Sequence, residues 1–209
     1  MKIVVITGDT LKQELIAQGL SDAADIEWSH DIHSVSKNAT VYIDLLFDTD
    51  RNNRKKILIQ LSAGIIVVND VLETCGNLPS NFVRINGWPT FLKRSITEAS
   101  CNDEIIKETA EKLFSIFNKK IEWTADIHGF ITPRVICMII NEAFFSLEDH
   151  VSSREEIDTA MKLGTNYPYG PFEWSRLIGI QNVYSLLSIL SKKNTRYTAC
   201  DLLKKELAF

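Results

Sequence analysis

Apolar, β-branched runs alternate with helical segments through the first part of this 209-residue chain. Residues 2–7 (KIVVIT), 39–47 (ATVYIDLLF) and 64–69 (GIIVVN) have the length and composition of buried strands. Residues 10–20 and 52–61 lie between these runs and carry apolar side chains at helical spacing. This alternation predicts βαβ units on a parallel sheet.

Shorter segments extend the same pattern. They are strands at 25–28, 82–85 and 120–123, a candidate strand at 91–96 and a helix at 103–117. The pattern as a whole predicts a Rossmann-like α/β domain over residues 1–124.

Beyond this region the spacing of apolar residues is helical throughout. It predicts helices at 135–147, 153–163, 170–178 and 182–190. Ser152 or Ser153 can cap the second of these helices, and Gly164 can end it in a left-handed conformation. Pro171 suits a rigid turn that enters the third. We therefore expect an all-helical second domain over residues 125–209, joined to the first near residues 124–128.

Charge and composition exclude several classes of partner. The net charge is −4 and Lys and Arg form no cluster, so nothing favours nucleic acid or an anionic membrane. No apolar run approaches the ~20 residues of a membrane span. The first residues, MKIVVITGDTLKQ, lack a secretory leader, so a cytoplasmic location is expected.

Metal and disulfide sites are also not expected. The four cysteines lie far apart and form no CxxC pair, which favours reduced thiols. His30 and His33 are close together in a polar stretch without a third ligand, which is typical of solvated loop residues.

The stretch from Gly129 to Ile180 carries a dense set of motifs: a Gly-Phe-Ile turn, a helix with Glu-Ala, an Ile-Asp-x-Ala-Met-x-x-Gly segment and Pro-x-Gly-Pro-Phe-Glu. The matching residues are Gly129, Phe130, Arg134, Glu142, Ala143, Ile157, Asp158, Ala160, Met161, Gly164, Pro168, Gly170, Pro171, Phe172 and Glu173. In these motifs the chain strongly resembles the C-terminal domain of 3-hydroxyacyl-CoA dehydrogenases. The resemblance implies an NAD-dependent oxidoreductase of fatty-acid metabolism.

The N-terminal part resembles the same family more faintly. Residues 38–61 look like the family's strand that ends in an acidic residue, here Asp44, and residues 81–98 look like its catalytic segment. The two-helix insertion that the family carries after its second strand is missing, because Trp28 leads within about ten residues to Ala39. The resemblance thus implies a shortened, divergent member.

The expected cofactor turn departs from the family's pattern. A dinucleotide site needs small residues where backbone amides approach the pyrophosphate. In register with GxGxxG, the glycine places hold Thr7, Asp9 and Lys12. Gly8, Asp9 and Thr10, with Asp44, are the positional candidates for cofactor binding, but the Asp9 carboxylate opposes a phosphate and can itself cap the helix. We expect a turn without cofactor; a degenerate nucleotide site, or another anion attracted by Lys12, stays open.

Residues 81–98, which resemble the family's catalytic segment, also depart from the family's pattern. The resemblance implies a His–Glu pair, and this chain has Asn86 at the His position and Glu98 at the Glu position. An asparagine amide can hydrogen-bond to a carbonyl group but cannot take a proton at accessible pH. The family's Asn before Arg134 is replaced by Pro133, and its serine falls near Asn69, Asp70 and Val71, so Asn69 or Asp70 remains a candidate polar contact.

Other family residues point to structure rather than chemistry. The resemblance implies structural roles for Arg134, Glu142 and Glu173. The apolar face of the helix at 135–147 is wider than a single core stripe and suits the homodimer interface, through the helical domain, that the resemblance implies.

Three functions remain open on this basis. We favour a homologue with lost or altered dehydrogenase activity that binds a small molecule or a protein partner and needs no cofactor. The alternative is an active NAD-dependent 3-hydroxyacyl-CoA dehydrogenase with a variant site. A third hypothesis is a different enzyme that uses Asn86, Glu98 and Asp44, with Glu98 as general acid or base.

Overall fold

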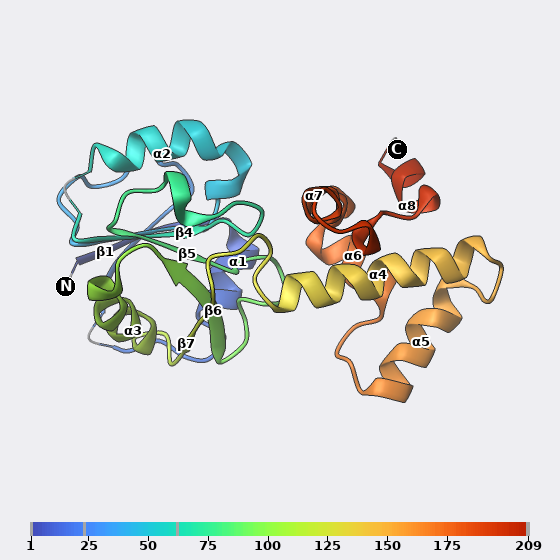
Figure 1. The fold of residues 1–209 in the computed structure, drawn as a ribbon. Coiled ribbons are helices and arrows are strands. Elements are labelled where there is room, and N and C mark those ends of the chain that lie inside the picture. The colour runs from blue at the N-terminus through green and yellow to red at the C-terminus, as the bar shows by residue number, and fades with distance from the viewer. Residues whose placement is uncertain (1, 23, 62, 208–209) are drawn as a thin grey trace. The chain divides into compact units, whose positions relative to one another are not determined.

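The chain forms two compact units in the computed structural model, which describes residues 2–22, 24–61 and 63–207 (Figure 1). The units are Met1–Phe130 and Ile131–Phe209. Residues 125–130, which the sequence assigned to the helical part, pack within the sheet unit. Asp126 accepts a hydrogen bond from the amide of Cys75 (3.0 Å), and the Gly129 amide donates to the Val71 carbonyl (2.8 Å).

The first unit is built on a seven-stranded sheet with the order β2-β1-β3-β4-β5-β6-β7. The strands are β1 (Lys2–Ile6), β2 (Asp25–Ser29), β3 (Val41–Asp44), β4 (Ile65–Asn69), β5 (Phe82–Ile85), β6 (Ile96–Cys101) and β7 (Lys120–Trp123). All neighbouring pairs are parallel except β5 and β6. The Rossmann-like fold class is confirmed.

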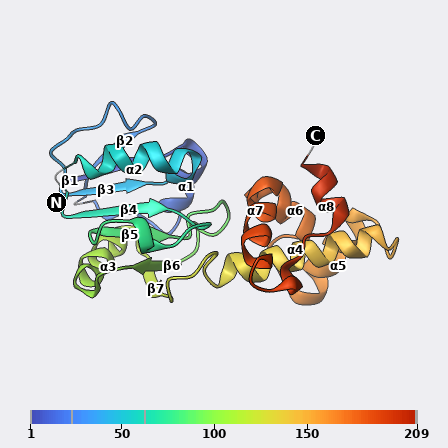
Figure 2. The same ribbon diagram turned by 45° about the horizontal axis from the view of Figure 1, so that its top comes forward.

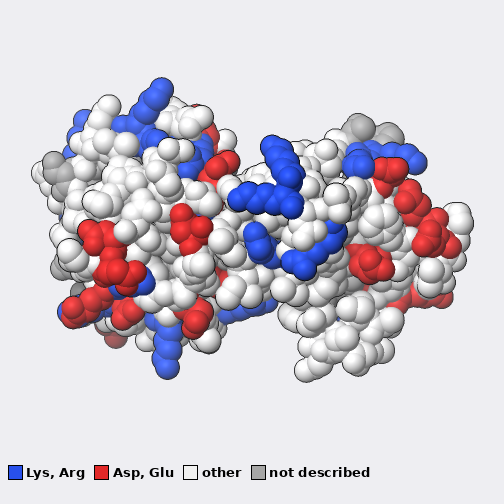
Figure 3. Space-filling model, in the orientation of Figure 1, with Lys and Arg blue, Asp and Glu red and all other residues white. Residues whose placement is uncertain are grey.

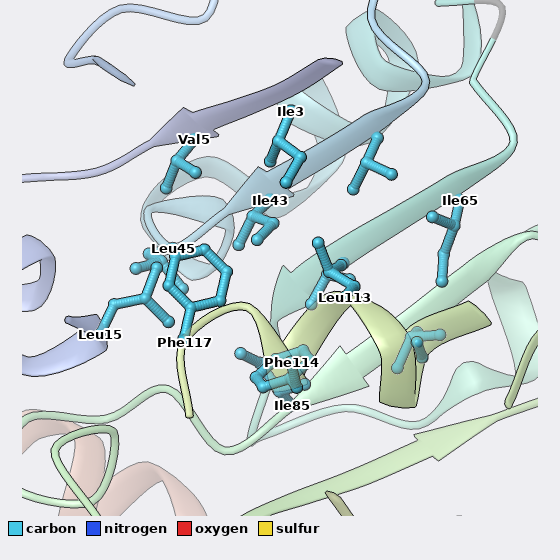
Figure 4. Packing of buried hydrophobic residues seen from close by; sticks show 14 of the residues in the cluster. Ile3, Val5, Leu15, Ile43, Leu45, Ile65, Ile85, Leu113, Phe114 and Phe117 are labelled. Carbon is cyan, nitrogen blue, oxygen red and sulfur yellow. The ribbon is translucent and has the colours of Figure 1, made fainter. Parts of the chain in front are cut away.

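Helices cover both faces of this sheet, as Figures 1 and 2 show. The helices are α1 (Asp9–Leu15), α2 (Arg51–Ile59) and α3 (Lys107–Ser115), with 3₁₀ turns at Phe47–Asp50, Cys75–Asn77 and Glu104–Ile106. Leu113, Phe114 and Phe117 pack with Leu15 against one face of the sheet (Figure 4). Leu58 of α2 packs against the other face. Because β1, β3 and β4 are covered on both faces, their sequences are continuous apolar runs.

Two features of the sheet unit differ from the sequence-based expectation. The candidate strand at 91–96 is wrong: Phe91 and Leu92 are buried in turns, and Thr90 has a positive φ of 78°, which interrupts an extended chain. The strand begins only at Ile96. No helix lies between β5 and β6 to carry the chain back, so β6 runs antiparallel to β5.

The second unit is all-helical, as expected. Its elements are α4 (Thr132–Glu148), α5 (Arg154–Thr165), α6 (Pro171–Ile178), α7 (Ile180–Ser191), a 3₁₀ turn at Thr195–Tyr197 and α8 (Asp201–Glu206). The long α4 packs against α6, α7 and α8, and the rings of Phe144 and Phe172 meet at 5.1 Å. The sequence did not predict α8. No helix in the described part of the chain is long and apolar enough to cross a membrane.

Capping residues define the ends of α5. Ser153 and Glu156 form the expected capping box, in which each side chain bonds the other residue's amide. The expected end at Gly164 is wrong, because the helix continues to Thr165 and Asn166 takes the left-handed conformation (φ 54°). Asparagine tolerates that conformation better than most residues, so the helix ends there without glycine.

Candidate functional site

Polar side chains gather where the parallel strands of the sheet unit end. Asp44 ends β3, Asn69 ends β4, and Asn86 follows β5 directly. The register aligns Ile6 with Asp44 and Asn69 with Ile85, so these ends lie along one edge of the sheet. In open α/β sheets, ligands bind outside this carboxyl edge.

Asn86 and Glu98 lie side by side at this edge. The Asn86 side-chain amide donates to Oε2 of Glu98 at 2.9 Å, and its backbone amide donates to the Glu98 carbonyl at 3.0 Å. Both residues are buried, with 3% and 9% of their surface exposed. The structure therefore brings the two sequence-predicted residues together.

The Asn86 side chain is only half satisfied. Its Oδ1 atom is buried and has no hydrogen-bond partner among the described residues. A buried acceptor without a partner costs about 1–3 kcal/mol, which a water or a ligand group relieves.

Asn69 holds the turn that follows Asn86. Its Oδ1 accepts from the Gly87 amide at 3.0 Å, and its Nδ2 donates to the Leu45 carbonyl and to Asp48 Oδ2, both at 3.3 Å. A Cβ atom on Gly87 would lie 2.8 Å from Cγ of Asn69, so this contact requires glycine. The neighbouring candidate Asp70 is instead bound by Arg51 at 2.8 Å.

Asp44 is fully buried and tightly paired. Nε and Nη2 of Arg54 each donate to one of its oxygens at 2.7 Å, and the Leu46 amide donates to Oδ1 at 3.0 Å. Burial raises the pKa of the Asp44 carboxyl, an effect that Arg54 partly opposes. Both oxygens are thus already used within the protein, which leaves little acceptor capacity for a ribose or for proton transfer.

Asp48 is a site residue that sequence reasoning missed. Burial raises its pKa to about 6, and the charges of Asp70 and Asp44 add to the shift. Through Asn69 it is linked to the turn beside Asn86. The only sequence signal was its place in the acidic turn after Asp44, which did not indicate that its pKa is raised.

The candidate cofactor turn lies between β1 and α1. Gly8 is the N-cap in an extended conformation and no side chain caps the helix, so the expected capping by Asp9 is wrong. Asp9 and Thr10 are exposed, and a Cβ atom on Gly8 would meet nothing within 4 Å. Oδ1 of Asp9 lies 3.6 Å from Nε2 of His30.

These residues do not fit a pyrophosphate. The exposed Asp9 carboxylate stands in the first turn of α1, where the pyrophosphate would lie in a dinucleotide fold, and repels it. The turn also shows no close backbone approach that only glycine allows, because Gly8 has open space around it. Lys12, the cation considered for another anion, lies over the Trp28 ring at 4.7 Å.

In the helical unit, the motif residues hold elements together. Asp158 of α5 accepts from the Phe172 and Glu173 amides at 2.8 and 3.2 Å, and so caps α6. Glu173 accepts from the Gly170 amide and from Lys162 at 2.9 and 2.6 Å, which agrees with its expected structural role.

A cavity of about 410 Å³ lies beside α4 in the same unit. Arg134, Val135 and Glu142 of α4 line it together with Arg196 and Tyr197. The Arg134 guanidinium lies 6.0 Å from the centre of the Tyr197 ring.

The described residues were compared with the requirements of a metal site and of a disulfide bond. They contain no group of three or more His, Cys, Asp or Glu side chains that could hold a metal ion. Cys75, Cys101, Cys137 and Cys200 are free thiols in this structure.

A doubly wound sheet with polar residues along its carboxyl edge, followed by a helical unit, defines the class of dinucleotide-fold dehydrogenases. The sequence model of the 3-hydroxyacyl-CoA dehydrogenase C-terminal domain matches residues 129–208. A probable 3-hydroxybutyryl-CoA dehydrogenase of Bacillus subtilis is 32% identical over 197 residues, which are 91% of this chain and 67% of that protein. The chain belongs to the 3-hydroxyacyl-CoA dehydrogenase family.

Two further relatives show the extent of the similarity. The 3-hydroxyadipyl-CoA dehydrogenase of Escherichia coli is 37% identical over 163 residues, 77% of this chain but 30% of that protein. The crystal structure of (S)-3-hydroxybutyryl-CoA dehydrogenase from Ralstonia eutropha has the same fold, with a TM-score of 0.76 at 22% identity, over 100% of this chain and 94% of that one. This chain therefore spans less than a third of the Escherichia coli relative's length.

Proposed function

We propose that this chain has lost or altered the dehydrogenase activity of its family and acts as a binding or interaction protein. The observation that carries the proposal is the Asn86–Glu98 contact. Asn86 stands where the resemblance implies the catalytic histidine, and its amide nitrogen is already committed to Glu98 at 2.9 Å. An amide does not accept the proton that must leave a hydroxyl group as hydride departs.

The cofactor turn supports the same proposal. A carboxylate in the first turn of α1 opposes a bound pyrophosphate. Arg54 also occupies both oxygens of Asp44. We therefore propose that the chain works without NAD.

The alternative is an active NAD-dependent 3-hydroxyacyl-CoA dehydrogenase, and one observation favours it. Asn86 and Glu98 keep a direct hydrogen bond at the place where the family's pair is expected. This alternative needs another base, and Asp48, with a pKa of about 6 and a link through Asn69 to Gly87, is a candidate. The third hypothesis, a different enzyme built on Glu98 and Asp44, loses support because Arg54 occupies Asp44.

The deciding experiment is a titration of the purified protein with NADH, followed by nucleotide fluorescence and by thermal shift. Acetoacetyl-CoA is added in a second series. We expect no saturable NADH binding and no NADH oxidation. Saturable binding with oxidation on adding acetoacetyl-CoA would establish the alternative instead.

Two variants make the test sharper. Asn86→His restores a base beside Glu98, and Asp9→Gly removes the carboxylate from the first turn of α1. If the cofactor turn is the main obstacle, NADH binding appears with Asp9→Gly and not with Asn86→His. Wild-type activity that disappears in Asp48→Asn would identify Asp48 as the replacement base.

We further propose that the chain forms a homodimer through its helical unit. Ile131 and Val135, at the start of α4, are 55% and 51% exposed, although both are large apolar residues. Exposed apolar residues that adjoin a cavity are typical of an interaction surface.

A further inference from the structure

A second cavity, of about 260 Å³, lies in the sheet unit between the loop after β2 and the end of α2. Ile32, Val35 and Leu61 form its apolar interior and are 4%, 7% and 9% exposed. This loop joins β2 directly to β3 without a helix between them.

The rim of this cavity is polar and cationic. His33 and Lys37 of the loop and Gln60, just after α2, line it with exposed side chains. All three can donate hydrogen bonds, and no carboxylate lines the cavity among the described residues.

The loop that forms one wall is held in place by hydrogen bonds. The Ser36 amide donates to Glu27 Oε1 at 2.9 Å, and the Tyr42 hydroxyl donates to the Ser36 carbonyl at 2.7 Å. Nearer the rim, the His33 amide donates to Asp31 Oδ1 at 2.9 Å. The wall is therefore formed before any ligand arrives, which lowers the ordering cost of binding.

The opposite wall, formed by Ile57, Gln60 and Leu61, is uncharged, although α2 itself is basic. The sequence of α2, RNNRKKILI, has four basic residues and no acidic one. Arg51 and Arg54 are neutralised by buried carboxylates, whereas Lys56 is exposed to solvent. In Figure 3, Lys and Arg side chains lie along the top of the sheet unit, where Figure 1 places α2. The cation at the cavity itself is Lys37 on the rim, and a positive charge there favours an anionic ligand.

We propose that this cavity binds a small monocarboxylate with a compact apolar body. The apolar body packs against Ile32, Val35 and Leu61. The carboxylate lies at the rim, where Lys37 supplies a charge-assisted hydrogen bond and the side chains of Gln60 and His33 supply further donors. The volume is below the ~300–1,000 Å³ of sites for drug-sized ligands, so the ligand is small.

This site is separate from the proposed function. Neither Asn86 nor Glu98 lines the cavity, and its residues all come from the loop after β2 and from α2 and its end. Binding here is measured without NADH or an acyl-CoA, so its failure leaves the proposed loss of dehydrogenase activity unaffected.

The test is an NMR titration of the ¹⁵N-labelled full chain with sodium benzoate. We expect saturable shifts of the backbone amides of residues 32–37 and 57–61, with half-saturation on the order of 1 mM for a ligand of about nine non-hydrogen atoms. Benzyl alcohol and benzylamine have a similar shape without the negative charge, and inorganic phosphate has the charge without the apolar body. We expect each to bind at least ~10-fold more weakly than benzoate.

Two matched variants locate the carboxylate. Lys37→Gln removes the charge at the rim and should weaken benzoate binding by about tenfold. Lys56→Gln removes an equal charge from the exposed side of α2, outside the cavity, and should change affinity less than about twofold. Absent benzoate shifts, equal shifts with phosphate, or equal losses in the two variants would each overturn the proposal.

Discussion

The carboxylates at the carboxyl edge of the sheet differ in what surrounds them. Asp44 and Asp70 each contact an arginine, whereas Asp48 contacts the neutral amide of Asn69. Desolvation and the negative charges of Asp70 and Asp44 both disfavour the ionised form of Asp48, and no arginine among the described residues pairs with it as in the other two. The pKa of Asp48 therefore rises to about 6 from 3.8.

The first prediction at this scale concerns Asp48 and pH. The folded-state pKa is above the unfolded value, so the folded chain binds the proton more tightly. Asp48 therefore stabilises the fold at low pH, and this contribution is lost as the pH rises from about 4 to about 6. Asp48→Asn should raise the free energy of unfolding at pH 7.5 by about 1–2 kcal/mol and change it little at pH 4.

Urea denaturation of the wild type and the variant across this pH range measures the effect. Asp50→Asn is the matched control, because Asp50 is exposed and caps α2, a role that asparagine also performs. Equal pH dependence in wild type and Asp48→Asn would show that Asp48 is not the titrating group.

The second prediction at this scale concerns Arg84, which is fully buried. It donates to the Glu73 and Ile127 carbonyls, pairs with Asp126 at 3.3 Å and lies 4.3 Å from the Phe130 ring centre. Arg84→Met should destabilise the sheet unit by about 2–4 kcal/mol, because the Glu73 and Ile127 carbonyls lose a buried donor and Asp126 loses its cationic partner.

Thermal unfolding measures this loss, and hydrogen exchange locates it. Faster exchange of the amides of Cys75 and Gly129 is expected in Arg84→Met, since Arg84 holds residues 125–130 in place. Arg94→Met is the control, because Arg94 is exposed. Equal destabilisation by both variants would contradict the role assigned to Arg84.

At the scale of elements, the Asp158 carboxylate joins α5 to the start of α6. It accepts from the Phe172 and Glu173 amides, and a Cβ atom on Gly170 would lie 2.3 Å from its Cγ. Two separate motifs of the sequence, IDTAM and PYGPFE, thus meet in one capping contact. Their spacing is explained by packing rather than by ligand binding.

This contact predicts that Asp158→Ala destabilises the helical unit by about 2–3 kcal/mol, because two buried amides lose their acceptor. Gly170→Ala should also destabilise it, because the new Cβ displaces the carboxylate. Circular dichroism during chemical denaturation measures both effects. Thr159→Ala on the exposed face of α5 is the control, and an Asp158→Ala variant as stable as this control would refute the capping role.

At the scale of the whole molecule, the proposed homodimer is open to direct measurement. Val135→Asp places a charge on the exposed apolar start of α4 and should convert a dimer to a monomer with its fold retained. Light scattering after size-exclusion chromatography gives the mass of each species. Ile105→Asp, at an 83% exposed residue of the sheet unit, should remain dimeric. A wild-type protein that is monomeric in this measurement would contradict the proposed homodimer.

Much of the fold could be predicted from the sequence alone. The strands β1 and β4 were predicted because burial on both faces leaves a continuous β-branched run. Helix α5 was predicted because its apolar spacing and its serine cap are both local features of the sequence. The segment at 91–96 was mispredicted because its apolar residues are buried in turns, and a pattern of side chains does not reveal the backbone conformation at Thr90.

The candidate site, like the fold, could be predicted from the sequence only in part. The sequence by itself determined that the chain has Asn86 where the resemblance implies a histidine and Asp9 in the turn after the first strand, because the identity of a side chain at a position is read directly from the sequence. Only the tertiary structure decided that Asn86 touches Glu98, that Arg54 takes both oxygens of Asp44 and that Asp48 contacts Asn69. Those facts depend on groups from separate strands and helices meeting at one edge of the sheet, and distances of that kind arise only when the whole unit packs.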